Sequence, residues 1–283
     1  MNPMRTRLKI RSACGAALVL AGLALAGCGA PLRSFERKTL NPGFISAATP
    51  ADLGVPFERV AIKSGPRTLD GFLVRALSSC PRTAAVLIYH GRGETIADWT
   101  KVQQRLRESC ISSLVFDYSG HGRSVGPGTV ANLNADAAAA GQTFNALFPK
   151  QRRCLLSHSM GGGPLLQAAT QPGAAPDCVV VASPFSSLRD MAVLGGLPKP
   201  LRFILPDVWN NAQTAQRLNA PLLWLHSQTD TTIPMTSGRL VYDAKRGNKT
   251  AVVVAGFDHN AIYKALPAAI WSPITAFILG PPT

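Results

Sequence analysis

The chain has 283 residues and a formal charge of +14, from 29 Lys and Arg against 15 Asp and Glu. Because 46% of the residues are hydrophobic and only 16% are charged, the chain can bury a sizeable core, which excludes an intrinsically disordered protein. Glycine and proline occur at ordinary frequencies without an internal repeat, which excludes a collagen-like chain.

The first 27 residues have the layout of a secretory signal. A basic stretch over 1–11 precedes an apolar stretch over about 13–26, which is short for a membrane span. Residues 25–28 read LAGC and resemble the bacterial lipobox, in which cleavage precedes the cysteine and its thiol is acylated. We therefore predict a lipoprotein signal peptide over 1–27 and lipidation at Cys28. An ordinary signal peptide and an uncleaved anchor are the alternatives.

Cleavage would remove 27 residues and four positive charges, leaving 256 residues and a charge of +10. The remaining basic residues are scattered and form no long block with interleaved aromatic residues, so we expect no nucleic-acid partner. A basic body tethered to an anionic envelope surface explains the excess. Gly29, rather than Asp, follows the candidate lipid cysteine. By resemblance to lipoprotein sorting signals, this favours the outer membrane, facing the periplasm, in a Gram-negative host.

Residues 28–56 contain prolines and small residues without a sustained period, and we interpret them as a tether. Two alternating runs over 57–64 and 68–76 flank a Gly-Pro turn and predict an antiparallel hairpin. Compact apolar runs then predict parallel strands separated by helices. These runs cover 84–91, 112–120, 153–162, 178–185, 221–230 and 250–260.

A stretch over about 185–219 lacks a strand pattern and is longer than an ordinary connection, which predicts a helical lid or cap. The segment 266–280 contains a proline but enough apolar residues for a closing helix. The chain from 57 to 283 is therefore predicted to be one α/β domain with a mostly parallel sheet and a short helical cap.

The sequence SHSMG over 157–161 nearly matches the nucleophile elbow G-x-S-x-G. A predicted strand ends at the motif and a predicted helix begins after it, so Ser159 would stand at a tight turn with its hydroxyl exposed. A strand that happens to end in serine is the alternative. A serine hydroxyl needs a base, and of the five histidines only His259, in a loop after the last strand, is well placed.

A carboxylate must orient that histidine, and Asp230 follows the strand before the last one. The order Ser159, Asp230, His259 is the order expected for this kind of site. Asp258 competes, but as the immediate neighbour of His259 it would point elsewhere. Asp190 and Asp207 in the insertion are weaker candidates. Acyl transfer also needs oxyanion donors, and we assign them to the backbone N–H groups of Met160 and Arg92.

The chain resembles the serine hydrolases of the α/β-hydrolase superfamily from about Phe57 to its C-terminus. The motifs that carry the resemblance are YHGRGE, DYSGHGRS, SHSMGG, HSQTDTTIP and GFDHN, in that order. The insertion looks like that of the small-cap branch, which includes membrane-associated esterases and depalmitoylating thioesterases. Ser157 and Ser227 replace the glycines usual in the family. The resemblance makes Asp117, Gly120 and Gly122 structural, and Phe185 and Trp209 are candidates for the acyl pocket.

In this family's sheet, the strands beginning near 84 and 112 are neighbours, as are those beginning near 153 and 178. The resemblance therefore implies two disulfides, Cys80–Cys110 and Cys154–Cys178, which an oxidising periplasm permits. Four buried free thiols are the alternative. Because no metal-ligand spacing occurs, we expect no metal and no cofactor.

These observations predict an envelope lipoprotein that cleaves an acyl ester, thioester or amide through an acyl-enzyme on Ser159. Its expected partners are a small or lipid-like acyl substrate and, through the lipid anchor, the membrane, and we expect a monomer. A peptidase of the same fold and a catalytically silent binding module are the alternatives.

Overall fold

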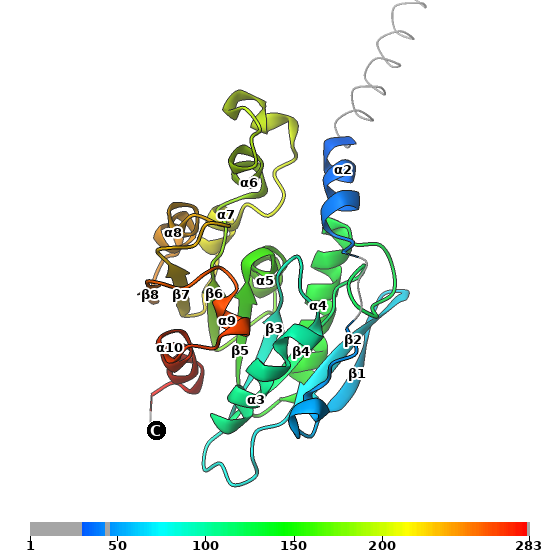
Figure 1. The fold of residues 1–283 in the computed structure, drawn as a ribbon, viewed down its shortest axis with the longest axis vertical. Helices are drawn as coiled ribbons and strands as arrows, with labels where there is room; N and C mark the ends of the chain where they lie inside the picture. Colours follow the sequence, from blue (N-terminus) through cyan, green and yellow to red (C-terminus); the bar gives the residue numbers. More distant parts are fainter. Residues whose placement is uncertain (1–29, 43–45, 282–283) are drawn as a thin grey trace, which may run out of the picture.

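A computed structural model describes residues 30–42 and 46–281, so the predicted signal peptide and Cys28 lie outside the described residues. The core is one eight-stranded sheet in the order β1-β2-β4-β3-β5-β6-β7-β8 (Figure 1). The strands are β1 (Glu58–Ser64), β2 (Arg67–Val74), β3 (Ala84–Tyr89), β4 (Ile111–Phe116), β5 (Arg152–His158), β6 (Cys178–Ala182), β7 (Leu222–Ser227) and β8 (Lys249–Val254). The β1–β2 and β2–β4 pairs are antiparallel and the other pairs parallel, which confirms the predicted hairpin and mostly parallel sheet.

Helices cover both faces of this sheet. The α-helices are α2 (Ala30–Thr39), α3 (Thr100–Glu108), α4 (Val130–Leu147), α5 (Gly162–Ala169), α6 (Leu188–Leu194), α7 (Asn211–Ala215), α8 (Met235–Ala244), α9 (Ala261–Lys264) and α10 (Ala268–Leu279). The 3₁₀ turns are η1 (Pro50–Leu53), η2 (Ile96–Trp99), η3 (Ser159–Gly161) and η4 (Lys199–Ile204). Within 30–42 and 46–281, no helix has the length and apolar character needed to cross a membrane.

The central strands are continuous apolar runs because they are buried on both sides. In β3, Ala85 and Leu87 pack into one hydrophobic cluster with α4 and α5, whereas Val86 and Ile88 pack into a second cluster with α3 and α10. A strand covered on both faces needs apolar side chains at every position rather than at alternate ones. Strand β8 differs from the buried strand expected, because it forms the sheet edge and exposes 43% of Val253.

The segment expected to be a tether contains ordered structure. Helix α2 is held by Glu36, whose carboxylate accepts a 2.8 Å hydrogen bond from the backbone N–H of Val130. Leu40 follows the helix and is fully buried in the core. Asn41 exchanges hydrogen bonds with the backbone of Gly128 at 2.8 and 3.1 Å. Residues 30–42 therefore dock on the main domain through contacts about 90 residues away in sequence, which a search for local periodicity does not detect.

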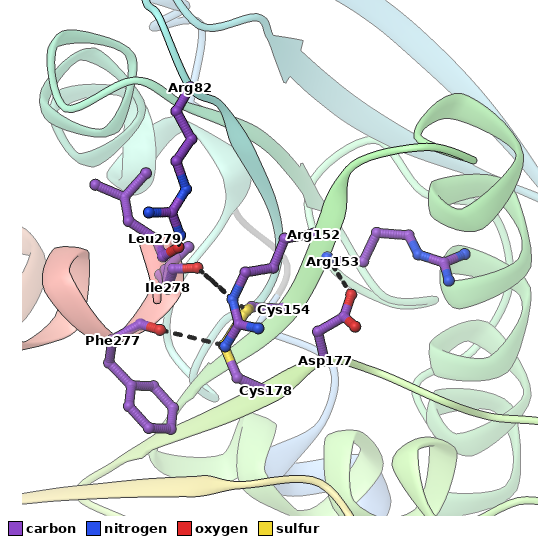
Figure 2. Close-up of a disulfide and its surroundings, with 9 residues drawn as sticks. All are labelled: Arg82, Arg152, Arg153, Cys154, Asp177, Cys178, Phe277, Ile278 and Leu279. Atoms are coloured by element: carbon purple, nitrogen blue, oxygen red, sulfur yellow. Dashed lines mark hydrogen bonds between the residues drawn. A yellow bond between two sulfur atoms is a disulfide. The ribbon is translucent and has the colours of Figure 1, made fainter. Parts of the chain in front are cut away.

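Both disulfides implied by the sequence resemblance are present. Cys80 pairs with Cys110 across a sequence separation of 30, and Cys154 pairs with Cys178 across a separation of 24. Cys154 and Cys178 are also direct partners in the β5–β6 register. Figure 2 shows that this second bridge lies beside the end of α10, where Arg152 Nε donates to the carbonyl of Ile278 at 2.9 Å. The bridge therefore lies at the starting end of β5.

Replacing both Cys80 and Cys110 with serine is expected to lower the free energy of unfolding by about 2–4 kcal/mol. The physical reason is that the unfolded chain regains the freedom of the closed loop. Urea unfolding of this variant and of the oxidised wild type measures the effect. Equal unfolding midpoints would show that the bridge does not form, and the Cys154→Ala/Cys178→Ala variant tests the second bridge separately.

Candidate active site

Ser159 stands on a strained turn between β5 and α5. Its backbone adopts a φ of +53°, which is unfavourable for a residue with a Cβ and is typical of a nucleophile elbow. The turn passes so close to β3 that a Cβ on Gly161 would lie 2.1 Å from the carbonyl oxygen of Tyr89. Only glycine fits at that position. Ser157, which replaces the usual glycine two residues before the nucleophile, is buried and accommodated.

Asp230 and His259 meet at the carboxyl ends of β7 and β8. His259 Nδ1 lies 2.7 Å from Asp230 Oδ2, and the other oxygen of Asp230 accepts 2.9 Å hydrogen bonds from the backbone N–H groups of Thr232 and Ile233. Burial alone would raise the pKa of Asp230, but the hydrogen bonds from His259 and Ile233 outweigh it and lower the pKa to about 2. The carboxylate is therefore ionised at neutral pH and can hold the His259 ring in one orientation.

The competing carboxylates have other partners. Asp258 is exposed and accepts a 2.9 Å hydrogen bond from the backbone N–H of Asn260, so it shapes the histidine loop. The Asp190 carboxylate accepts a hydrogen bond from the Ser186 hydroxyl and pairs with Arg202, and Asp207 pairs with Arg189 and accepts from Asn210. Of the four candidates, the structure brings Asp230 to His259.

A buried ion pair, Glu94 and His158, lies next to the site, and the sequence analysis did not identify it. His158, one residue before the nucleophile, places Nδ1 2.7 Å from Glu94 Oε1 and Nε2 2.9 Å from the carbonyl oxygen of His259. Glu94 also accepts hydrogen bonds from the backbone N–H of Gly91 and from the Trp99 indole. His158 is fully buried and Glu94 is 4% exposed. The pair therefore connects the loop after β3, the elbow and the histidine loop.

The charges of this pair favour each other. Burial alone would raise the pKa of Glu94, but the interaction with His158 outweighs it and lowers the pKa to about 2. Burial alone would lower the pKa of His158, but the Glu94 carboxylate outweighs it and raises the pKa. The imidazolium form of His158 donates from both ring nitrogens, which satisfies both Glu94 and the His259 carbonyl.

Replacing Glu94 with alanine is expected to lower the free energy of unfolding by about 3–5 kcal/mol, because it leaves His158 buried without its partner. Glu94→Gln is expected to cost less, because an amide can keep the hydrogen bonds of the site. Urea unfolding at several pH values measures both. Equal losses for the two variants at every pH would contradict a contribution from charge.

The sign of the pH effect follows from the two shifts. Because the pKa of Glu94 is lowered on folding, its contribution to the free energy of unfolding is complete above the ordinary pKa of 4.5 and is lost as the pH falls through about 2. Because the pKa of His158 is raised on folding, its contribution to the free energy of unfolding is complete below pH 6.5 and is lost as the pH rises through the pKa of the folded protein. The stability difference between the wild type and Glu94→Ala is therefore expected to be largest between pH 4.5 and 6.5.

The two residues assigned to the oxyanion site share one cavity with Ser159. Arg92 and Met160 both line this cavity, which has a volume of about 570 Å³. The carbonyl of Arg92 lies 3.2 Å from Nε2 of the buried His121, which anchors the backbone of the loop after β3. His121 is thereby committed to loop structure rather than to chemistry.

The remaining wall of the cavity is mostly apolar. It is formed by α2, the cap and the loop after β7, and the residues include Leu32, Phe185, Leu188, Met191, Leu197, Ile204, Leu205, Trp209 and Ile233. Phe185 and Trp209 therefore lie where an acyl pocket was expected. None of the cavity residues in the described part of the chain is acidic. Within the same described residues, no group of three or more His, Cys, Asp or Glu side chains could hold a metal ion.

Solved structures of esterases have a similar architecture. The structure of the Pyrococcus furiosus esterase Pf2001 aligns with a TM-score of 0.66 and 20% sequence identity, over 84% of this chain and 96% of that one. Est1E from Butyrivibrio proteoclasticus, solved with ferulic acid bound, aligns with a TM-score of 0.61 and 17% identity, over 78% of this chain and 96% of that one. The chain has the α/β-hydrolase fold.

Sequence comparisons agree with this assignment. The Hydrolase_4 family model, described as serine aminopeptidase, S33, matches residues 81–214, which are just under half of the chain. Human protein ABHD12B is 27% identical over 206 residues, covering 64% of this chain and 57% of the relative. The zebrafish (Danio rerio) lysophosphatidylserine lipase ABHD12 is 26% identical over 208 residues, covering 64% of this chain and 54% of the relative. The chain therefore matches little more than half the length of these two proteins.

Proposed function

We propose that this chain is a serine hydrolase of the α/β-hydrolase family that cleaves acyl esters or thioesters through a Ser159 acyl-enzyme, with His259 as the base and Asp230 as its partner. The observation that carries the proposal is the 2.7 Å contact between His259 and Asp230, in a loop that is hydrogen-bonded to His158, the residue before Ser159. Ser159 itself stands on a strained turn and lines a mostly apolar cavity. Ester and lipid hydrolysis in the names of similar proteins supports the same reaction class.

The proposed reaction begins when His259 Nε2 accepts the proton of the Ser159 hydroxyl as its oxygen attacks the acyl carbonyl. The negative charge that develops on the carbonyl oxygen is stabilised by the backbone N–H groups of Met160 and Arg92, each worth about 3 kcal/mol of barrier. His259 then gives its proton to the leaving alcohol or thiol. A water molecule, deprotonated by His259, releases the acid and restores Ser159.

The cavity favours an acyl group over an amino terminus. An aminopeptidase must bind the positive α-amino group of its substrate, for which buried carboxylates are the suitable partners. The cavity residues of the described chain contain no Asp or Glu, whereas the apolar side chains from the cap and α2 suit a hydrocarbon chain. We therefore favour the esterase over the peptidase of the same fold.

We further propose that the hydrolase is a monomeric lipoprotein of the bacterial envelope, acylated at Cys28 and facing the periplasm from the outer membrane. The LAGC sequence at 25–28 supports lipidation, and the two disulfides support an oxidising compartment. The short cap supports placement in the small-cap branch with membrane-associated esterases and depalmitoylating thioesterases.

A series of p-nitrophenyl esters tests the proposed function on the full chain purified in detergent. Each additional methylene that enters the cavity contributes about 0.8 kcal/mol, so kcat/KM is expected to rise up to about fourfold per methylene until the cavity is full. A matched series of aminoacyl p-nitroanilides tests the peptidase. Faster cleavage of the anilides than of every ester would favour the peptidase. If the wild type cleaves neither substrate series and is not labelled by a fluorophosphonate, a catalytically silent binding module is favoured.

A further inference from the structure

Large apolar side chains gather on the outer surface of the cap. Leu194 at the end of α6 is 52% exposed, and three residues of η4 are exposed to a similar degree: Leu201 (47%), Phe203 (63%) and Ile204 (52%). We call these four residues the cap patch. Single exposed apolar residues are ordinary, but four of them within eleven residues of the cap mark an interaction surface.

The cap patch continues into the cavity that contains Ser159. Ile204 is half exposed and also lines the cavity, and Leu205 follows it on the cavity wall. Ile204 therefore joins the exposed cap surface to the cavity that Ser159 lines. The position of the patch fits a route for substrate entry.

Basic side chains lie beside Phe203 of the cap patch. Lys199 and Arg202 belong to η4, and the guanidinium groups of Arg189 and Arg202 stack 5.5 and 4.8 Å from the centre of the Phe203 ring. Asp190 pairs with Arg202, and Asp207 pairs with Arg189. Residues 185–219 contain four basic side chains, including Arg217, and these two acidic ones, so the cap carries a net charge of +2. Exposed Arg37 and Lys38 of α2 add positive charge on the other side of the cavity. An apolar patch with basic side chains next to it suits an anionic lipid surface.

The start of the described chain lies at the same end of the molecule. Figure 1 shows that α2 and α6 both lie beyond the same end of the sheet. Residues of both helices line the cavity. Helix α2 begins at Ala30, two residues after Cys28. Two extended residues span at most about 7 Å, so a lipid attached to Cys28 would hold the beginning of α2 close to the bilayer surface.

We propose that the cap patch docks on an anionic phospholipid bilayer, with the cavity mouth facing the lipid, so that Ser159 acts on acyl chains taken directly from the membrane. The inference rests on the proposed ester hydrolysis for its substrate, but the docking itself does not depend on it. The occupant of the patch is the bilayer, rather than a second copy of the chain or another protein.

A position-resolved fluorescence experiment tests the docking on the full chain. Phe203→Cys, combined with Cys14→Ser and Cys28→Ser, is labelled with the environment-sensitive dye NBD. The matched control places the label at Leu240→Cys, because Leu240 on α8 is 50% exposed and does not line the cavity. Vesicles contain phosphatidylcholine alone or phosphatidylcholine with phosphatidylglycerol. We expect NBD emission at 203 to rise severalfold with the anionic vesicles, to rise less with the neutral ones, and to stay unchanged at 240.

Two results overturn the docking. One is unchanged emission at 203 with both vesicle types. The other is emission at 203 that rises with protein concentration in the absence of lipid, which would mean that a second copy covers the patch. Because the label reports from one position, attachment of the chain to vesicles through its N-terminal segment does not imitate docking of the cap.

An activity measurement separates this proposal from the proposed function. In the Leu201→Ser/Phe203→Ser variant, cleavage of a long-chain ester embedded in anionic vesicles is expected to fall at least about tenfold. Cleavage of dissolved p-nitrophenyl acetate, and both activities of the Leu240→Ser control, are expected to stay at the wild-type level. If the wild type cleaves neither ester, the proposed function fails, and NBD emission at 203 still decides the docking. Equal vesicle activity in the wild type and the double variant overturns substrate entry across the patch.

Discussion

Replacing Ser159 with alanine is expected to lower kcat for ester hydrolysis by at least about 10⁴-fold, because no acyl-enzyme can form and only binding and oxyanion stabilisation remain. Labelling by a fluorophosphonate should disappear with it. Both are measured on the full chain with a short-chain p-nitrophenyl ester, where chemistry rather than membrane access limits the rate.

The matched control is Ser157→Ala. Ser157 precedes the nucleophile by two residues and is buried, and its hydroxyl has no hydrogen-bond partner, so its loss should change kcat by less than about threefold. A Ser159→Ala enzyme that keeps its activity and its labelling would refute the proposed nucleophile. A wild type with neither property would instead favour the silent binding module.

Replacing Asp230 with asparagine is expected to lower kcat by about 10⁴-fold with little change in KM. The oxygen of the new amide can still accept from Thr232 and Ile233, so its NH₂ group must face His259 Nδ1. His259 then carries its proton on Nε2 and cannot accept one from Ser159. A pH profile of kcat/KM and the ester kinetics of the purified variant measure the loss.

Asp258→Asn is the control for this prediction. Asp258 neighbours His259 in sequence, but its side chain accepts from the backbone of Asn260, which an asparagine oxygen can also do. Its activity is expected to stay within about threefold of the wild type. A larger loss of kcat in Asp258→Asn than in Asp230→Asn would show that Asp258, rather than Asp230, orients His259.

The sheet was predictable because its signals are local. A parallel strand covered on both faces must be apolar at every position, and each such run in this chain ends at a glycine-rich or polar loop. The carboxyl ends of parallel strands share one edge, so the order Ser159, Asp230, His259 along the chain already implied a common site. The cysteine pairs followed from the same strand order, once the chain was compared with a known family.

Contacts between distant segments were decided only by the tertiary structure. Glu94 and His158 are 64 residues apart, and no spacing in the sequence shows that a carboxylate after β3 pairs with a histidine inside the elbow. Helix α2 looked like a tether because its burial depends on Val130, Gly128 and the core rather than on its own period. The sequence by itself determined the chemical groups and the strands that present them. The tertiary structure decided which buried charges meet and which surface the cavity faces, because burial and pairing free energies depend on neighbours that the chain brings together only when it folds.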